Sequence, residues 1–216
     1  MQDRTHLIQI TTGSVDEAPR IFSEARREGT PIVVVVDPPV LCCVPKLDIP
    51  SGVITLGQVW GAHDGVLDPG MKCCWCKHRR IAAMITMNSI RYDAPIRNCP
   101  TKDNVRVSID ISLTFKIGPG EEDCKSFVYQ LGATRLDEML AAESEEAIRN
   151  FVHTVRLRQI QDIKGEIAQT LLSDLNRKFN EFGVFFENVQ IMSIKIPQEL
   201  QDALSETTGY DIKLQN

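Results

Sequence analysis

The sequence lacks the features that define several large classes of protein. It has no lysine- or arginine-rich arm, and its 216 residues carry a net charge of -5, which argues against a general nucleic-acid binder. It has no Asn-x-Ser/Thr acceptor, and its polar N-terminus, with Gln2 in second position, fits neither a secretory signal peptide nor N-myristoylation. We therefore expect a chain that faces the reducing cytosol and binds no nucleic acid.

Residue patterns typical of enzymes are also missing. The four histidines lie far apart in the sequence, and neither Gly-x-Ser-x-Gly nor His-Glu-x-x-His is present. The stretch "GPGEEDCKS" has Pro119 and Cys124 where a phosphate loop requires glycines, and its three acidic residues would repel phosphate. We expect no enzyme activity, no catalytic residue, no cofactor and no resident metal.

Long hydrophobic runs are absent too. The most apolar stretch, residues 31–45, is interrupted by Asp37, Pro38 and Pro39, and it is shorter than the roughly 20 residues of a membrane-spanning helix. Its four consecutive valines favour a buried β-strand over residues 32–36. A shallow re-entrant hairpin that turns at the two prolines is the alternative interpretation.

Two further strands are predicted from alternation. Residues 105–117 are apolar at every odd position and polar at every even one, so we expect one buried and one wet face. Residues 79–93 also alternate, but the apolar phase moves from odd to even positions, which we interpret as a β-bulge at residues 88–89. A similar phase change predicts a second bulge at residues 192–193.

Helical patterns lie before and between these strands. Ser14 and Glu17 have the spacing of a capping box, which predicts a helix over residues 14–28. Helical segments are also predicted over 121–132 and 134–160, and over 163–183 with Gly183 as its C-terminal stop. This order of strands and helices predicts an α+β fold.

The most unusual stretch is "GMKCCWCKHRR", residues 70–80. It contains a Cys-x-x-Cys pair, but a zinc site needs a second pair of ligands, and a redox pair normally begins a helix, whereas a strand is expected to follow here. The purely structural interpretation is that these cysteines act as small hydrophobic residues of a strand. Zinc binding and a reactive thiol centre stay open as alternatives.

Three stretches resemble the SPFH domain, also called the Band 7 domain, which is shared by stomatins, prohibitins, flotillins and the HflK/HflC proteins. They are "IPSGVITLGQVWGAHDGVLDPGMK" (49–72), "PTKDNVRVSIDISLTFKI" (100–117) and "FNEFGVFFENVQIMSIKIPQELQDAL" (179–204). Their separations are similar to those in the family, over about residues 48 to 206.

The resemblance implies a curved antiparallel sheet packed against helices, and a non-catalytic scaffold. It divides the chain into an N-terminal extension with a helix and an apolar strand (1–47), an SPFH domain (48–196) and the start of a C-terminal helix (197–216). The family also implies homo- or hetero-oligomers with SPFH proteins, a long C-terminal coiled coil, and a peripheral place on the lipid surface of the cytoplasmic side of a membrane. The family usually has a hydrophobic N-terminal anchor and a long C-terminal helix, whereas the apolar stretch over residues 31–45 is short and broken by prolines, and the sequence stops at Asn216.

Family members have an apolar, membrane-facing segment where this chain has "MKCCWCKHRR". The resemblance therefore makes a set of residues candidates for membrane contact or S-acylation, since two acyl chains anchor a protein much more firmly than one. These are Cys42, Cys43, Cys73, Cys74, Trp75 and Cys76. Candidate basic residues facing anionic lipid are Lys72, Lys77, Arg79 and Arg80. The alternative is a cytosolic scaffold without lipid contact, similar to the shoulder of the major vault protein.

Overall fold

The computed structural model describes residues 4–24, 29–37, 43–76, 78–156 and 164–195, and for residues 43–46 and 73–76 it describes the backbone alone. The strands follow one another as β1 (Leu7–Thr12), β2 (Thr30–Val36), β3 (Cys43–Ile49), β4 (Val53–Val59), β5 (Ala62–Leu67), β6 (Gly70–Cys76), β7 (Arg79–Thr86), β8 (Ile90–Pro100), β9 (Arg106–Ile117) and β10 (Val184–Lys195). The helices are α1 (Ala18–Ser23), α2 (Glu121–Ser126), the π-helix η1 (Phe127–Leu131), α3 (Gly132–Thr154), α4 (Lys164–Phe179) and the 3-10 helix η3 (Asn180–Phe182).

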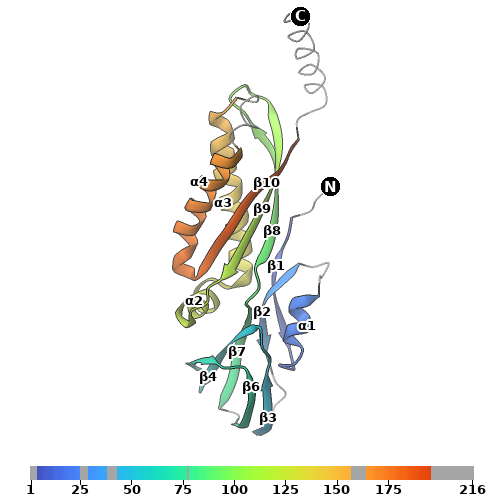
Figure 1. The fold of residues 1–216 in the computed structure, drawn as a ribbon, viewed down its shortest axis with the longest axis vertical. Coiled ribbons are helices and arrows are strands. Elements are labelled where there is room, and N and C mark those ends of the chain that lie inside the picture. The colour runs from blue at the N-terminus through green and yellow to red at the C-terminus, as the bar shows by residue number, and fades with distance from the viewer. Residues whose placement is uncertain (1–3, 25–28, 38–42, 77, 157–163, 196–216) are drawn as a thin grey trace, which may run out of the picture.

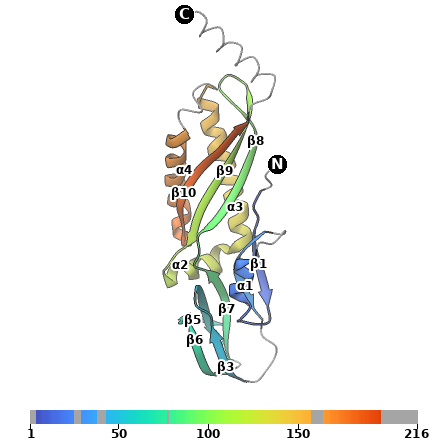
Figure 2. The ribbon, with the colours of Figure 1, turned by 45° about the vertical axis from the view of Figure 1, so that its right-hand side comes forward.

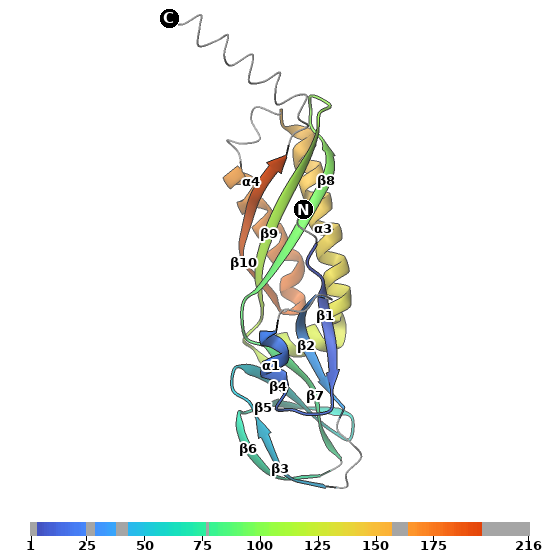
Figure 3. The same ribbon diagram turned by 90° about the vertical axis from the view of Figure 1, so that its right-hand side faces the viewer.

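The molecule is elongated, with a different sheet in each half (Figure 1). One half holds the antiparallel sheet β10-β9-β8, and helices α3 and α4 cover one face of it (Figures 1 and 2). The other half holds the sheet β1-β2-β7-β4-β5 and the two-stranded ribbon β3-β6, which lies at the far end (Figure 3). The predicted α+β fold, with a curved antiparallel sheet packed on helices, is confirmed.

Strand β9 forms where alternation predicted it. Its odd positions, from Val107 to Ile117, are all buried in the main hydrophobic core. The opposite face is less exposed to solvent than expected, because Asp110 and Ser112 are buried as well. The predicted bulge at residues 192–193 is confirmed, since the pairing of β10 with β9 shifts register between Ile191 and Ser193.

The phase change predicted as a bulge in a single strand over residues 79–93 has a different cause. β7 ends at Thr86 and β8 begins at Ile90, and the two strands belong to different sheets. The apolar phase changes because residues 87–89 separate the two strands, while Ala83 and Ile85 before them and Ile90 and Tyr92 after them all pack in the main hydrophobic core. The prediction of one bulged strand was therefore wrong.

Helix α1 is shorter than predicted, and the capping box does not form. The helix begins at Ala18 with Glu17 as N-cap and no side-chain cap bond. Glu17 instead accepts a hydrogen bond of 2.5 Å from the hydroxyl of Thr12, which also accepts one from the Ser14 N–H. A proline in the first turn favours a helix start here, because its fixed φ suits a helix and it has no N–H to satisfy.

The predicted strand over 32–36 is part of β2, and four of its five residues are buried. In α4 the residues Ile167, Leu171, Leu175 and Phe179 form the expected buried stripe. Gly183 then ends the helical segment in the left-handed conformation, as predicted. The predicted helix over 197–216 lies outside the described residues.

The N-terminal strands share a sheet with the rest of the chain. β1 pairs in parallel with β2, and β2 pairs antiparallel with β7. Helix α1 covers one face of this sheet, where Ala18 and Ile21 pack with Val34 and Met84 in a second hydrophobic cluster. The division of the chain at residue 47 stays a prediction.

Candidate functional site

The cysteine-rich motif forms strand β6, which pairs with β3 in a two-stranded ribbon. Cys43, Cys73, Cys74, Trp75 and Cys76 thus have defined positions along the ribbon, while their side chains are outside the described part. Cys42 and Lys77 lie outside the described residues altogether. The ribbon brings Cys43 and residues 73–76 to neighbouring strands.

Alternation along the ribbon separates its residues into two faces. Ile49 is buried, and Leu47 packs partly buried against the second hydrophobic cluster, so the odd positions of β3 mark the inner face. Asp48 is exposed, and its partner across the ribbon, Met71, is 59% exposed, so these two mark the outer face. By alternation, Cys43, Cys74 and Cys76 occupy inner-face positions, and Cys73 and Trp75 occupy outer-face positions.

A second tryptophan, Trp60, is the most exposed large apolar residue in the described part of the chain. It is 84% exposed and lies in the tight turn between β4 and β5. Trp60 and Gly61 have φ values of 52° and 83°, as in a two-residue type I′ hairpin turn. Tryptophan rarely adopts a left-handed conformation, so the surrounding contacts must maintain it.

Two contacts with the β6–β7 turn fix Trp60. Its backbone N–H donates a hydrogen bond of 2.8 Å to the carbonyl of His78. Its ring stacks on the His78 ring, with centroids 5.4 Å apart and planes inclined by 18°. The turn after the cysteine motif therefore supports a projecting indole. Sequence reasoning missed Trp60, although "VWGA" between two apolar runs is a hairpin signal.

Two of the four predicted basic residues, Arg79 and Arg80, contact other side chains of the chain. Arg79 forms an ion pair of 3.1 Å with Asp64, and Arg80 donates a hydrogen bond of 2.8 Å to Gln58. Both arginines are exposed, and Lys72 is half-buried. The Asp64 carboxylate therefore weakens the positive potential at Arg79, whereas the neutral Gln58 leaves the charge of Arg80 in place.

A polar network connects this end of the molecule to the helical half. His63 on β5 lies 3.2 Å from a Glu121 carboxylate oxygen and contacts the Tyr129 ring edge-on. The side-chain amide of Gln58 donates a bond of 2.9 Å to the Tyr129 hydroxyl. Tyr129 belongs to the π-helix η1, a rare element that often marks functional positions.

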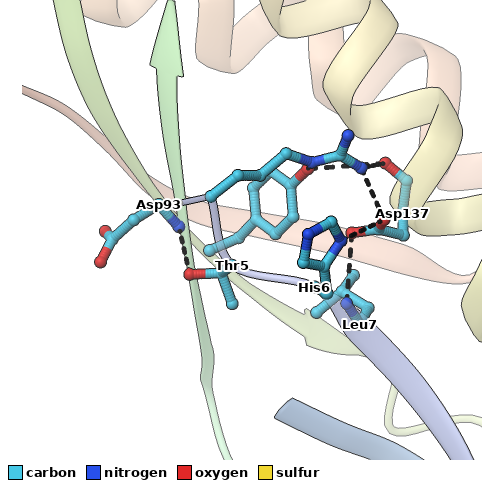
Figure 4. Close-up of polar contacts among 7 residues, drawn as sticks. Thr5, His6, Leu7, Asp93 and Asp137 are labelled. Carbon is cyan, nitrogen blue, oxygen red and sulfur yellow. Dashed lines mark hydrogen bonds and ion pairs between the residues drawn. The ribbon is translucent and has the colours of Figure 1, made fainter. Parts of the chain in front are cut away.

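A second polar cluster attaches the start of β1 to α3 (Figure 4). The Arg4 guanidinium donates to the Asp137 carboxylate at 2.5 Å and to the Tyr92 hydroxyl at 2.9 Å. The other Asp137 oxygen accepts a bond of 3.2 Å from the Leu7 N–H, and His6 lies 3.4 Å from the carboxylate. Burial, with the Asp137 charge adding to it, raises the pKa of Tyr92. We call Arg4, His6, Tyr92 and Asp137 the clamp.

The described residues show no grouping of three metal-ligating side chains. Among them the free cysteines are Cys99 and Cys124, both buried. Burial raises the pKa of Cys124 to about 11, so this thiol is protonated and unreactive at neutral pH. No helix of the described part has the length and apolar character to cross a bilayer.

Comparison with known proteins places these features in a family context. The family model described as "SPFH domain / Band 7 family" matches residues 48–215. Similar proteins include stomatin of Mus musculus, 28% identical over 121 residues (56% of this chain, 40% of the relative), and Stomatin-4 of Caenorhabditis elegans, 26% identical over 121 residues (56% and 41%). An uncharacterized protein of Archaeoglobus fulgidus is 19% identical over 119 residues (55% and 45%). The alignments span less than half the length of each of these relatives.

Proposed function

Since the chain belongs to the SPFH domain / Band 7 family, we propose that it is a non-catalytic scaffold that binds peripherally to the cytoplasmic face of a membrane and assembles with other SPFH-domain chains. The match to the family and the similarity to stomatins support this proposal. The contact surface is the end of the molecule that carries the β3-β6 ribbon and the turn at Trp60.

The observation that carries the proposal is the exposed indole of Trp60. Tryptophan is favoured at membrane interfaces because its ring is apolar and its N–H is polar. The stack on His78 positions the indole ring before any contact is made, and the bond from the Trp60 backbone N–H to the His78 carbonyl fixes the backbone that carries it. A pre-positioned side chain loses little conformational entropy on binding.

The shape of the molecule fits attachment at this end. The ribbon lies at one end of the long axis, and β10 ends near the other (Figures 1 and 3). A surface bound by the ribbon thus leaves the end of β10 directed away from it. Self-association can then take place at a distance from the lipid.

Flotation with vesicles of phosphatidylcholine and phosphatidylserine tests the membrane contact. We expect the chain to float with the vesicles, and Trp60→Ala and Met71→Glu to reduce the floating fraction. The matched control is Met192→Glu, because Met192 is a similarly exposed methionine on β10, 47% exposed against 59% for Met71. Equal flotation of Met71→Glu and Met192→Glu would contradict the proposed orientation.

We also propose S-acylation on the outer face of the ribbon, at Cys73. This position lies on the same face as the exposed Met71, so an acyl chain there can enter a bilayer that Trp60 touches. Acyl-biotin exchange on the protein from cells should label the chain, and Cys73→Ser should remove more label than Cys74→Ser. Labelling that resists substitution of Cys73, Cys74 and Cys76 together would refute this site.

The second candidate function is a cytosolic scaffold without lipid contact. The engagement of Arg79 by Asp64 and of Arg80 by Gln58 favours it, because these side chains are partly satisfied within the chain. A chain that stays at the bottom of the flotation gradient and sediments as an oligomer in analytical ultracentrifugation would support this candidate. A monomer under all conditions would contradict both candidates.

A further inference from the structure

The pairing of β3 with β6 sets two cysteines opposite each other. Cys43 is the direct partner of Cys76 in the antiparallel register of the ribbon. Cys73, by contrast, is paired with Lys46 in this register. Since opposite residues of an antiparallel pair share a face, both Cys43 and Cys76 belong to the inner face.

The register alone satisfies the main geometric condition for a disulfide. Opposite residues in an antiparallel pair have Cα atoms about 4.5 Å or about 5.5 Å apart, depending on the hydrogen-bonding pattern. Disulfides span Cα separations of about 4.4–6.8 Å, so either type of pair is suitable. We propose that Cys43 and Cys76 form a reversible cross-strand disulfide, a modification separate from acylation on the outer face.

We expect the chain to lie in a reducing compartment, where permanent disulfides are rare. The bond between Cys43 and Cys76 is therefore expected to be transient, forming on oxidation and being reduced again. The oxidant is a small-molecule disulfide such as oxidised glutathione. The thiolate of one cysteine attacks it, which forms a mixed disulfide and releases one glutathione thiolate. The second cysteine thiolate then attacks the protein sulfur and releases the second glutathione. Two protein thiols are oxidised, and one glutathione disulfide is reduced to two glutathione molecules.

The disulfide would join the strands of the ribbon at the end where β6 leaves it. A two-stranded ribbon is only marginally stable by itself, so a covalent link there should reduce its opening. Cys76 is two residues before His78, whose carbonyl and ring hold Trp60. Oxidation is therefore expected to restrict the movement of His78, and with it the position of the Trp60 indole that His78 contacts.

Two variants with the same number of thiols test the proposal. The first retains Cys43 and Cys76, with Cys42, Cys73 and Cys74 replaced by serine. The second retains Cys43 and Cys73, with Cys42, Cys74 and Cys76 replaced by serine. The buried Cys99 and Cys124 stay in both. Each folded variant is equilibrated with reduced and oxidised glutathione, its remaining thiols are alkylated with N-ethylmaleimide, and it is digested with trypsin.

We expect mass spectrometry to find residues 28–46 linked to 73–77 in the first variant, two hydrogens lighter than the sum of the two peptides. This link should be at least about tenfold more abundant than in the second variant, because only the first has its cysteines in register. Equal linkage in the two variants, or glutathione adducts alone in the first, would overturn the proposal. Dithiothreitol should remove the link, and amide exchange in residues 70–76 should be slower in the oxidised first variant.

Discussion

The clamp predicts a large effect from one substitution in α3. Asp137 is only 8% exposed, and its carboxylate accepts hydrogen bonds from the Arg4 guanidinium and the Leu7 N–H. Asp137→Ala removes both acceptors and so releases the start of β1 from the helix. The substitution should destabilise the whole protein and loosen β1 in particular.

The size of the effect follows from two terms. Leu7 is 3% exposed, so its N–H cannot turn to water, and an unsatisfied buried N–H costs about 1–3 kcal/mol. The Arg4 side chain is 33% exposed, so solvent screens the ion pair and its loss adds about 1 kcal/mol. We expect Asp137→Ala to reduce the free energy of unfolding by about 2–4 kcal/mol. Asp137→Asn keeps an acceptor for Leu7 and should cost only about 1 kcal/mol.

Urea unfolding followed by circular dichroism measures these values, and amide exchange of β1 shows where the loss occurs. The control is Glu138→Ala, which removes an exposed carboxylate from the next position of the same helix and should change stability by less than about 0.5 kcal/mol. A double-mutant cycle of Arg4→Met with Asp137→Asn should give a coupling of about 1 kcal/mol. A cost below about 0.5 kcal/mol for Asp137→Ala, or unchanged exchange of β1, would refute this account of the clamp.

Two other substitutions test the helical half by chemical unfolding. Gly183→Ala should reduce the free energy of unfolding by about 2–4 kcal/mol, because Gly183 has φ 72° and an added Cβ would lie 2.3 Å from the Asp123 carbonyl oxygen. The control Gly13→Ala, with open space around the added Cβ, should change this free energy little. Burial raises the pKa of Asp110, but hydrogen bonds, the largest from Lys195, outweigh it and hold this pKa below its usual value. The charged carboxylate therefore stabilises the fold above the unfolded-state pKa of about 4, and this contribution is lost as the pH falls through the lower folded-state pKa. The difference in stability between the wild type and Asp110→Asn should shrink on acidification; a constant difference from pH 7 to pH 3 would contradict this assignment.

Local patterns were sufficient to predict much of the fold. The alternation over 105–117 predicted β9, and the spacing of apolar residues predicted α4, because period two and period 3.6 are direct consequences of backbone geometry. The four valines predicted the buried strand β2. These signals depend only on neighbouring residues, so no tertiary information was needed.

The errors arose where distant partners decide the outcome. The odd-to-even change in apolar phase near residue 88 is the same for a bulge and for a strand that passes to another sheet, and only the partners of β7 and β8 distinguish them. Ser14 and Glu17 had the right spacing for a capping box, but the Glu17 carboxylate accepts a hydrogen bond from the Thr12 hydroxyl instead. The clamp joins residues more than 130 positions apart, and no sequence pattern links Arg4 to Asp137.

The passage of the chain from β7 into β8 has a mechanical consequence. Because residues 79–100 run from the ribbon half into the helical half, tension between the ribbon and the end of β10 would be carried through this segment into the sheet β10-β9-β8. Hydrogen bonds in such a sheet are perpendicular to the strands. A pull along β10 therefore loads them in shear, so that many must break together instead of one after another. An assembly of such chains would resist stretching along its long axis better than peeling from the side.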